Sequence, residues 1–312
     1  MKKVYATRKI ENIEYWRDYA KENNLFDLCW NEREENLSQA ELYSVAKGND
    51  ALITMLCDNI DADFLKENNH LLAISNYAVG HNNLDKKAAQ TYSIPLGNTP
   101  DVLTHATAEC ALTLLLMLSR RTQEAIANVK EGQWKTWEPL QFNGFDLRER
   151  TIGIIGDGRI GQAFAKMAEN LWQAKVLYYP YKDRGASEEQ FFGECDVISL
   201  HCPLNEKSEG LIDSHFIDRM EKPFYFINTA RGACHKEDDL LDGLRKGKIL
   251  GIGLDVTDPE PMQANSPLLK EESTVILPHI GSATKKTRQE MTKLCMKNIE
   301  AALTNKSMPH SI

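Results

Sequence analysis

The sequence of 312 residues contains no apolar stretch long enough to cross a membrane. Its most apolar segment, Ala111 to Leu118, follows His105 and Glu109 and is much shorter than the roughly 20 apolar residues that a membrane-spanning helix needs. A buried helix is the better interpretation of this segment. Residues Met1 to Ala6 also lack the apolar run and the cleavage site of a secretory signal, so we expect a cytoplasmic protein.

The chain also lacks a block of basic residues and any pair of cysteines at metal-binding spacing. Its formal net charge is −8, from 37 basic and 45 acidic residues, so charge gives little attraction to nucleic acid or to a membrane surface. The cysteines are odd in number and scattered, which argues against a disulfide framework and a zinc site. We expect reduced packing cysteines, no metal and a small-molecule partner. The seven cysteines are Cys29, Cys57, Cys110, Cys195, Cys202, Cys234 and Cys295.

Internal repeats and low-complexity segments are absent as well, and a chain of this length is expected to form two domains. In the N-terminal third, short β-like runs alternate with charged amphipathic stretches. This alternation is typical of a parallel sheet covered by helices. The predicted strands are Val4 to Thr7, Asp50 to Leu56 and Leu71 to Ser75.

The start of a long helix is predicted at Thr99, Pro100 and Asp101. Thr99 can cap exposed N–H groups, Pro100 suits the first helical turn, and the charge of Asp101 complements the helix dipole. We expect this helix to continue to Arg120 or Arg121. Its apolar second half predicts burial between the two domains.

A polar connection from Lys130 to Arg150 carries two tryptophans, Trp134 and Trp137. Because an indole combines a large apolar ring with a hydrogen-bonding N–H, these side chains suit an interface or the wall of a binding pocket. Packing of both rings in a core is the alternative.

A second α/β unit is predicted from residue 151 onward, where Thr151 to Ile155 form a short apolar strand of the kind buried on both faces. Helices are expected between most of the later strands, and a final helix from about Lys285 to Thr304. The later strands are predicted at Lys175 to Tyr179, Asp196 to Leu200, Tyr225 to Asn228, Gly251 to Asp255 and Thr274 to Leu277.

A glycine pattern of the form G-x-G-x-x-G occupies residues 156 to 161. It follows the apolar strand directly and opens a helix, Gln162 to Leu171, which is the context that dinucleotide binding requires. Gly156 permits the tight turn, Gly158 lets the backbone approach a pyrophosphate, and Gly161 allows close packing of helix on strand. The alternative is a glycine-rich turn that binds nothing.

The end of the next predicted strand bears on the choice of cofactor. A carboxylate there would hold the ribose 2′-hydroxyl of NAD, but this strand ends in Tyr179 and Pro180. Lys182 and Arg184 follow and can accept a 2′-phosphate, so the sequence favours NADP over NAD. Asp183 lies between these cations and could supply the missing carboxylate, and both cations could instead be solvated surface charges.

Arg231, Glu260 and His279 are the candidate catalytic residues, and each follows a predicted strand. Ligands bind at the carboxyl edge of a doubly wound sheet, so these distant residues can converge there. Arg231 can grip a carboxylate with two hydrogen bonds and polarise the adjacent carbonyl. His279 can protonate the carbonyl oxygen as hydride arrives, and Glu260 can orient the imidazole and favour its protonated form.

Taken singly, each of these residues has an ordinary structural alternative. Together, and in this order after the glycine pattern, the segments that carry these residues resemble the D-isomer-specific 2-hydroxyacid dehydrogenase family. The three segments are Ile227 to Gly232, Leu254 to Pro261 and Leu277 to Ser282. The resemblance covers nearly the whole chain. Further segments that carry it are Ser75 to Asp85, Asn98 to Arg121, and His201-Cys202-Pro203-Leu204.

The resemblance implies an α/β fold of two Rossmann or flavodoxin-like domains with parallel sheets. A dinucleotide-binding domain of residues 99–285 is expected to be inserted into a discontinuous substrate domain of residues 1–98 and 286–312. The family is typically dimeric, so we also expect a homodimer.

The resemblance further implies roles for individual residues. Arg231, Glu260 and His279 are catalytic in such segments, and the backbone of Val79 and Gly80 helps Arg231 and His279 to bind the substrate. Asp255 is expected to hold the nicotinamide carboxamide. The full set of expected cofactor contacts is Thr104, Gly156, Gly158, Arg159, Ile160, Gly161, Lys182, Thr229, Ala230 and Asp255.

Within the family, the chain is most similar to glyoxylate and hydroxypyruvate reductases. The expected activity is therefore NAD(P)H-dependent reduction of a small 2-keto acid to the D-2-hydroxy acid. Two alternatives are a dehydrogenase for a bulkier 2-keto acid, whose pocket would depend on Met55 and Leu56, and a non-enzymatic protein that senses dinucleotides.

The chain departs from the family pattern in two places. Between Tyr179 and Asp196 it is shorter than most relatives, and Ala186 to Cys195 predicts only the last helix of the usual connection. After the catalytic arginine, Cys234 and His235 stand where relatives usually carry more apolar residues, and we interpret both as loop residues.

Overall fold

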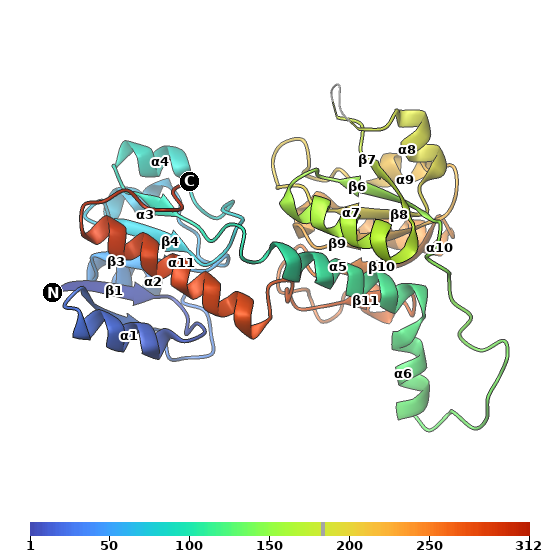
Figure 1. The fold of residues 1–312 in the computed structure, drawn as a ribbon, viewed down its shortest axis with the longest axis horizontal. Coiled ribbons are helices and arrows are strands. Elements are labelled where there is room, and N and C mark those ends of the chain that lie inside the picture. The colour runs from blue at the N-terminus through green and yellow to red at the C-terminus, as the bar shows by residue number, and fades with distance from the viewer. Residues whose placement is uncertain (182–184) are drawn as a thin grey trace. The chain divides into compact units, whose positions relative to one another are not determined.

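The computed structural model describes residues 1–181 and 185–312, which form two compact units (Figure 1). Unit 1 comprises Met1–Leu103 together with Ala283–Ile312, and unit 2 comprises Thr104–Ser282. Unit 1 is thus built from both ends of the chain, and unit 2 is continuous in sequence.

Unit 1 contains a five-stranded sheet in the order β2-β1-β3-β4-β5, and all of its neighbouring strands are parallel. From β1 the chain moves to one edge of the sheet and then crosses back to build the other side. The strands are β1 (Lys2–Ala6), β2 (Phe26–Trp30), β3 (Ala51–Thr54), β4 (Ala73–Asn76) and β5 (Leu96–Gly97).

The C-terminal helix α11 (Lys285–Leu303) packs against β4 and belongs to unit 1. Nδ2 of the buried Asn298 donates to Oγ of Ser75 at 3.2 Å and to the carbonyl of Asn98 at 3.0 Å. These bonds tie the end of the chain to the sheet formed by its beginning. The other helices of unit 1 are α1 (Ile13–Glu22), α2 (Gln39–Lys47), α3 (Ala62–Glu67) and α4 (Lys86–Thr91).

Within the described residues, unit 2 contains a six-stranded parallel sheet in the order β11-β10-β9-β8-β6-β7. The direction of winding reverses between β6 and β8, which is where an open α/β sheet binds its ligands. The predicted class of two α/β domains with parallel sheets is confirmed. The strands are β6 (Thr151–Ile155), β7 (Lys175–Tyr178), β8 (Val197–Leu200), β9 (Phe224–Asn228), β10 (Ile249–Leu254) and β11 (Thr274–Ile276).

The helix α5 (Thr104–Ser119) packs against α7 (Arg159–Trp172) and against β9 and β10 (Figure 1). The side chains of Ala111 and Leu114 are fully buried, so the apolar segment is a buried helix as predicted. Among residues 1–181 and 185–312, no helix combines the length and the apolar character needed to span a membrane. The other helical segments of unit 2 are α6 (Thr122–Lys130), α8 (Glu188–Glu194), α9 (Ser214–Arg219), α10 (Glu237–Arg245) and two short 3-10 helices, η1 (Gly232–Cys234) and η2 (Pro267–Lys270).

The predicted start of the long helix at Thr99 is wrong. The N–H of Thr99 donates to the carbonyl of Ala78 at 2.9 Å, and its buried hydroxyl has no hydrogen-bond partner among the residues that the structure describes. Asp101 adopts a left-handed φ of 71°, and α5 begins only at Thr104. A long-range contact therefore overrides the local capping signal.

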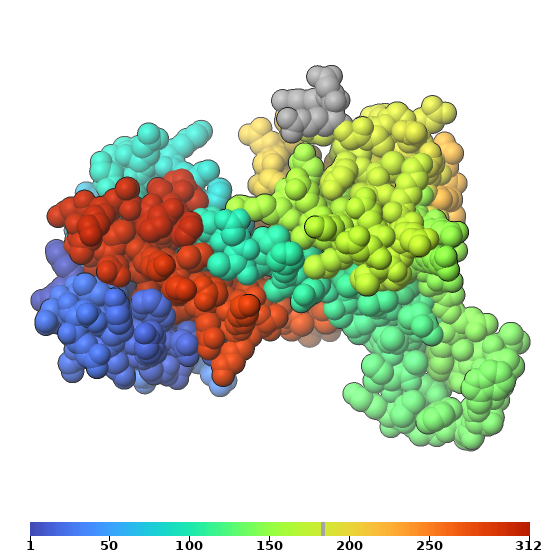
Figure 2. All heavy atoms as spheres, in the orientation of Figure 1, coloured from blue at the N-terminus to red at the C-terminus, as the bar shows by residue number. Residues whose placement is uncertain are grey.

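Packing of the two tryptophans in a core is also excluded within this chain. Trp134 and Trp137 are 65% and 79% exposed, and Leu140 beside them is 83% exposed. These residues lie on the segment after α6, whose side chains stand out in light green in Figure 2.

The cysteines are all free, and only some of them are packing residues as expected. Cys195, Cys234 and Cys295 are buried, but Cys29 and Cys57 are exposed, so the expectation is wrong for these two.

Candidate active site

The candidate catalytic residues gather at the carboxyl edge of the sheet in unit 2. Arg231 follows β9, Glu260 follows β10 and His279 follows β11, and these three strands are parallel neighbours. The glycine pattern follows β6 at the same edge. Unit 2 alone therefore brings the three residues to the side of the sheet on which ligands bind.

His279 and Glu260 are joined by a direct hydrogen bond between Nδ1 and Oε1. Because a carboxylate only accepts hydrogen bonds, this contact assigns the Nδ1 proton to the bond with Glu260. The side chains are 30% and 42% exposed, so the pair is accessible from the surface of unit 2. Nε2 of His279 is then the nitrogen that can deliver a proton to a substrate.

Asp255 fixes the backbone on which His279 stands. One carboxylate oxygen accepts the N–H of Ile280 at 2.7 Å, and the other accepts the N–H of Gly281 at 2.7 Å. His279 itself has a left-handed φ of 55°, a conformation that costs free energy for a residue with a side chain. The two bonds to the buried Asp255 hold the chain in this conformation, and burial raises the pKa of Asp255 above its usual value.

Arg231 lies in a tight loop that packs against the segment carrying Glu260. A Cβ on Gly232 would lie only 2.0 Å from the carbonyl oxygen of Thr257, so only glycine permits this approach. Nη1 of Arg231 donates to the carbonyl of Ala230 at 2.7 Å. Burial lowers the pKa of Arg231 from its usual value, and the negative charge of Glu260 acts in the opposite sense. Glu260 thus interacts electrostatically with both Arg231 and His279.

Cys234 and His235 lie in the connection between β9 and α10, where the sequence predicts loop residues, but both are buried. Cys234 ends the 3-10 helix η1 and is fully buried, while His235 is only 6% exposed. Nδ1 of His235 lies 2.9 Å from Nδ2 of Asn228, the last residue of β9. The sequence does not predict that Asn228 and Asp255 position the candidate catalytic groups, since both residues act through contacts that cross loops.

The glycine pattern fits a dinucleotide. Gly156 has a φ of 112°, and a Cβ there would lie 2.6 Å from the backbone of Cys202. A Cβ on Gly161 would lie 2.1 Å from the carbonyl oxygen of Gly156, as expected for close packing of α7 on β6. At Gly158, in contrast, no heavy atom of the described residues lies within 4 Å of the Cβ position, so the backbone there is open to a pyrophosphate.

Thr229 supplies a second observation that fits a bound cofactor. Its buried Oγ1 has no hydrogen-bond partner within residues 1–181 and 185–312, although it stands beside Ala230 at the carboxyl end of β9. A buried hydroxyl without a partner is costly, and a ligand at this edge can satisfy it. The remaining expected contacts are Arg159 and Ile160 in the first turn of α7, and Thr104 at the start of α5. Lys182 lies outside the described residues.

Val79 and Gly80, the expected substrate-binding residues of unit 1, follow β4. The carbonyl of Val79 accepts a hydrogen bond from Nδ2 of Asn98 at 2.9 Å, and that of Gly80 accepts one from Nδ2 of Asn76 at 3.0 Å. Two buried asparagines therefore fix the conformation of this loop.

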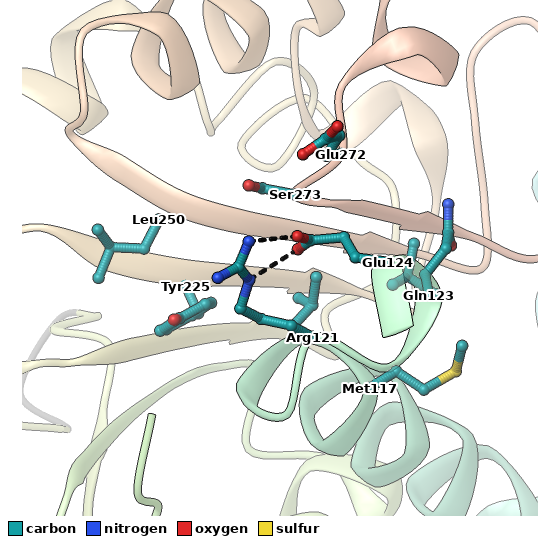
Figure 3. Close-up of a pocket in the computed structure, with 10 residues that line it drawn as sticks. Met117, Arg121, Gln123, Glu124, Tyr225, Leu250, Glu272 and Ser273 are labelled. Atoms are coloured by element: carbon teal, nitrogen blue, oxygen red, sulfur yellow. Dashed lines mark hydrogen bonds and ion pairs between the residues drawn. The ribbon is translucent and has the colours of Figure 1, made fainter. Parts of the chain in front are cut away.

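A small pocket of about 110 Å³ in unit 2 is distinct from the candidate site (Figure 3). It lies near the amino ends of the strands, beside Tyr225, Leu250 and Ser273, and contains none of the predicted site residues. The guanidinium of Arg121, which lines this pocket, donates two hydrogen bonds to the carboxylate of Glu124. An internal ion pair at the amino edge gives no reason to expect a ligand there.

Comparisons with known proteins agree with this geometry. The family described as "D-isomer specific 2-hydroxyacid dehydrogenase, NAD binding domain" matches residues 112–281. The human glyoxylate reductase/hydroxypyruvate reductase is 39% identical over 290 residues, covering 89% of this chain and 88% of that protein. A glyoxylate reductase of Korarchaeum cryptofilum is 36% identical over 310 residues, covering 96% of this chain and 92% of that protein.

A solved structure of a protein from Thermus thermophilus superposes with a TM-score of 0.92 at 36% identity and covers 99% of both chains. The chain therefore belongs to the D-isomer-specific 2-hydroxyacid dehydrogenase family, and the predicted resemblance is confirmed.

Proposed function

We propose that this protein reduces glyoxylate or hydroxypyruvate to the D-2-hydroxy acid with NADPH or NADH. The observation that carries the proposal is the His279–Glu260 pair, which lies with Arg231 at the carboxyl edge of the sheet beside the glycine pattern. The names of several relatives support the choice of substrate, since the human, Korarchaeum cryptofilum and Thermococcus litoralis proteins, each covered over most of its length, are named glyoxylate or hydroxypyruvate reductases.

Each catalytic residue has a distinct role in the proposed reaction. Arg231 binds the substrate carboxylate and polarises the keto group, and the backbone of Val79 and Gly80 contributes to binding. His279 delivers a proton from Nε2 to the carbonyl oxygen, and Glu260 stabilises the imidazolium before transfer. The nicotinamide, when bound, supplies the hydride. Asp255 holds the backbone after His279 and can also accept a hydrogen bond from the carboxamide, because a carboxylate offers about four acceptor positions.

Residues 99–285 are proposed to form the dinucleotide-binding domain, and residues 1–98 with 286–312 the substrate domain. The proposed cofactor preference is NADP. Nζ of Lys207 donates to the hydroxyl of Tyr181, which follows β7, at 2.8 Å. A cation therefore lies near the end of this strand, where NAD-binding proteins normally carry a carboxylate. Initial rates with NADPH and NADH at equal concentration test this preference.

The protein is proposed to act as a homodimer in the cytoplasm. The exposed side chains of Trp134, Trp137 and Leu140 support a dimer, because large apolar groups on one short segment favour burial in an interface.

The activity is tested with purified protein, NADPH and a panel of 2-keto acids. We expect oxidation of the cofactor with glyoxylate or hydroxypyruvate, at higher kcat/KM than with phenylpyruvate. A preference for phenylpyruvate would favour the dehydrogenase for bulkier acids. Cofactor binding without turnover on any acid would refute the proposal and favour a dinucleotide-sensing protein.

A further inference from the structure

The loop that carries Arg231 is organised by one buried amide, the side chain of Asn228. Its Nδ2 donates to the carbonyl of Arg231 at 2.8 Å, and its Oδ1 accepts the N–H of Ala230 at 2.8 Å. Both bonds are made to the backbone that leads into the arginine. The position of the guanidinium therefore depends on the orientation of this amide.

The orientation of the amide depends in turn on His235. A side-chain amide can be rotated by half a turn, which exchanges its donor and its acceptor. Nδ1 of His235 lies 2.9 Å from Nδ2 of Asn228, and the second N–H of that group is available to it. If the amide were rotated, its oxygen would face the lone pair of Nδ1, and Ala230 and Arg231 would each lose their partner. A hydrogen-bond acceptor at Nδ1 thus selects the amide orientation in which Asn228 bonds to the backbone of Ala230 and Arg231.

His235 is itself held in place by its surroundings. The backbone N–H of His235 donates to the carbonyl of Gly232 at 3.0 Å, and its backbone forms a β-bridge with Ile212. The ring stands edge-on to Phe226, with centroids 6.0 Å apart. Burial lowers the pKa of His235 to about 4, so the ring is neutral near pH 7 and Nδ1 can act as an acceptor.

We propose that His235 is a positioning residue for Arg231, acting through the side chain of Asn228. The inference rests on the proposed function, in which Arg231 binds the substrate carboxylate. A leucine at this position would leave one N–H of Asn228 buried without an acceptor. His235 and Asn228 therefore act together to fix the backbone that carries Arg231.

The test compares His235→Leu with His235→Asn. Leucine and asparagine have nearly the same shape, but only asparagine offers an acceptor, its Oδ1, close to where Nδ1 of histidine stands. We expect His235→Leu to lower kcat/KM for glyoxylate by about 10- to 100-fold, mainly through KM, while the Kd of NADPH is unchanged. We expect His235→Asn to stay within about threefold of the unmodified protein. Equal kcat/KM in all three proteins would overturn the inference.

Two controls separate positioning from a general loss of stability. Thr274→Val removes another buried hydrogen-bonding side chain from the same sheet, at the amino end of β11, and is expected to lower Tm without changing kcat/KM. In an Arg231→Ala background, His235→Leu should cause no further loss, because no guanidinium remains to be positioned. A further loss of similar size in that background would show that His235 does not act through Arg231.

If the protein reduces none of the acids, the proposed function is refuted but the inference about His235 is not. A measurement that needs no enzymatic turnover then still tests the inference. Nitrogen-15 NMR of labelled histidine reports which ring nitrogen of His235 carries the proton. We expect an unprotonated Nδ1 and a protonated Nε2 at pH 7, and a changed side-chain amide signal of Asn228 in His235→Leu. A protonated Nδ1, or an amide signal that His235→Leu leaves unchanged, would overturn the inference.

Discussion

The buried His235 and the half-buried His201 predict that unit 2 loses stability as the pH falls below neutrality. Burial lowers the pKa of His201 to about 3 and that of His235 to about 4, from a usual value of 6.5. The folded protein therefore resists protonation of both rings, whereas the unfolded chain takes up the protons near pH 6.5. The stabilisation is complete above pH 6.5 and is lost as the pH falls from 6.5 toward the folded pKa values.

The size of the loss follows from these values. Between pH 7 and pH 5, His201 and His235 become almost fully protonated in the unfolded chain, while both rings stay neutral in the folded protein. The free energy of unfolding should fall by about 2 kcal/mol for each histidine, or about 4 kcal/mol for both. The raised pKa of the buried Asp255 acts in the opposite sense, because the folded protein binds a proton there at a higher pH than the unfolded chain does.

Hydrogen exchange followed by mass spectrometry measures this loss separately in each unit. After correction for intrinsic exchange rates, amides of β8 and β9 should lose protection by about 4 kcal/mol between pH 7 and pH 5. Amides of β1 and β3 in unit 1 are the internal control, since none of the three histidines of unit 1 is buried. His235→Asn should halve the loss in unit 2. Equal pH dependence in the two units would refute the reasoning.

Three further predictions concern the site and the assembly. His279→Ala and Arg231→Ala should each lower kcat/KM by about 10²- to 10⁴-fold with unchanged circular dichroism, and near-normal steady-state rates in either variant would remove that residue from the mechanism. Asp255→Asn turns one hydrogen-bond acceptor beside Ile280 and Gly281 into a donor and should cost about 2 kcal/mol of stability, measured by urea unfolding, and lower kcat; an unchanged kcat would show that His279 does not need this support. Replacing both Trp134 and Trp137 with alanine should convert dimer to monomer in sedimentation velocity, and an unchanged oligomeric state would place the interface elsewhere.

The strands of unit 2 could be predicted well because most of them are buried on both faces. Thr151–Ile155 was predicted with the bounds that the structure shows, and its five residues are all buried. In unit 1, two strands were missed. Phe26–Trp30 lies at a sheet edge, where the exposed Asp27 and Cys29 interrupt its apolar pattern, and Leu96–Gly97 is too short to give a pattern. Periodicity identifies strands only where burial imposes it.

The residues that position the candidate catalytic groups could not be predicted from the sequence. Arg231, Glu260 and His279 were found because each stands in a segment of known type after a strand. Asn228 and Asp255 stand in the same segments, but their contacts cross loops, and no local spacing encodes which backbone groups they bind. His235 gave one signal, a polar residue at a usually apolar position, and burial rather than sequence reveals its partner.

The site thus has two layers with different chemistry. The groups that would meet a substrate, such as His279 and Glu260, are partly exposed, whereas Asn228 and Asp255 beneath them are buried and bind backbone. The two buried residues are also joined to each other, because the N–H of Asp255 donates to the carbonyl of Asn228 at 2.9 Å between the ends of β10 and β9. Every one of these contacts lies within unit 2. The relative positions of the arginine, the carboxylate and the imidazole are therefore set by a single sheet edge. If the loop of Val79 and Gly80 in unit 1 binds the substrate as proposed, a change in that loop should alter KM without disturbing the hydrogen bond between His279 and Glu260.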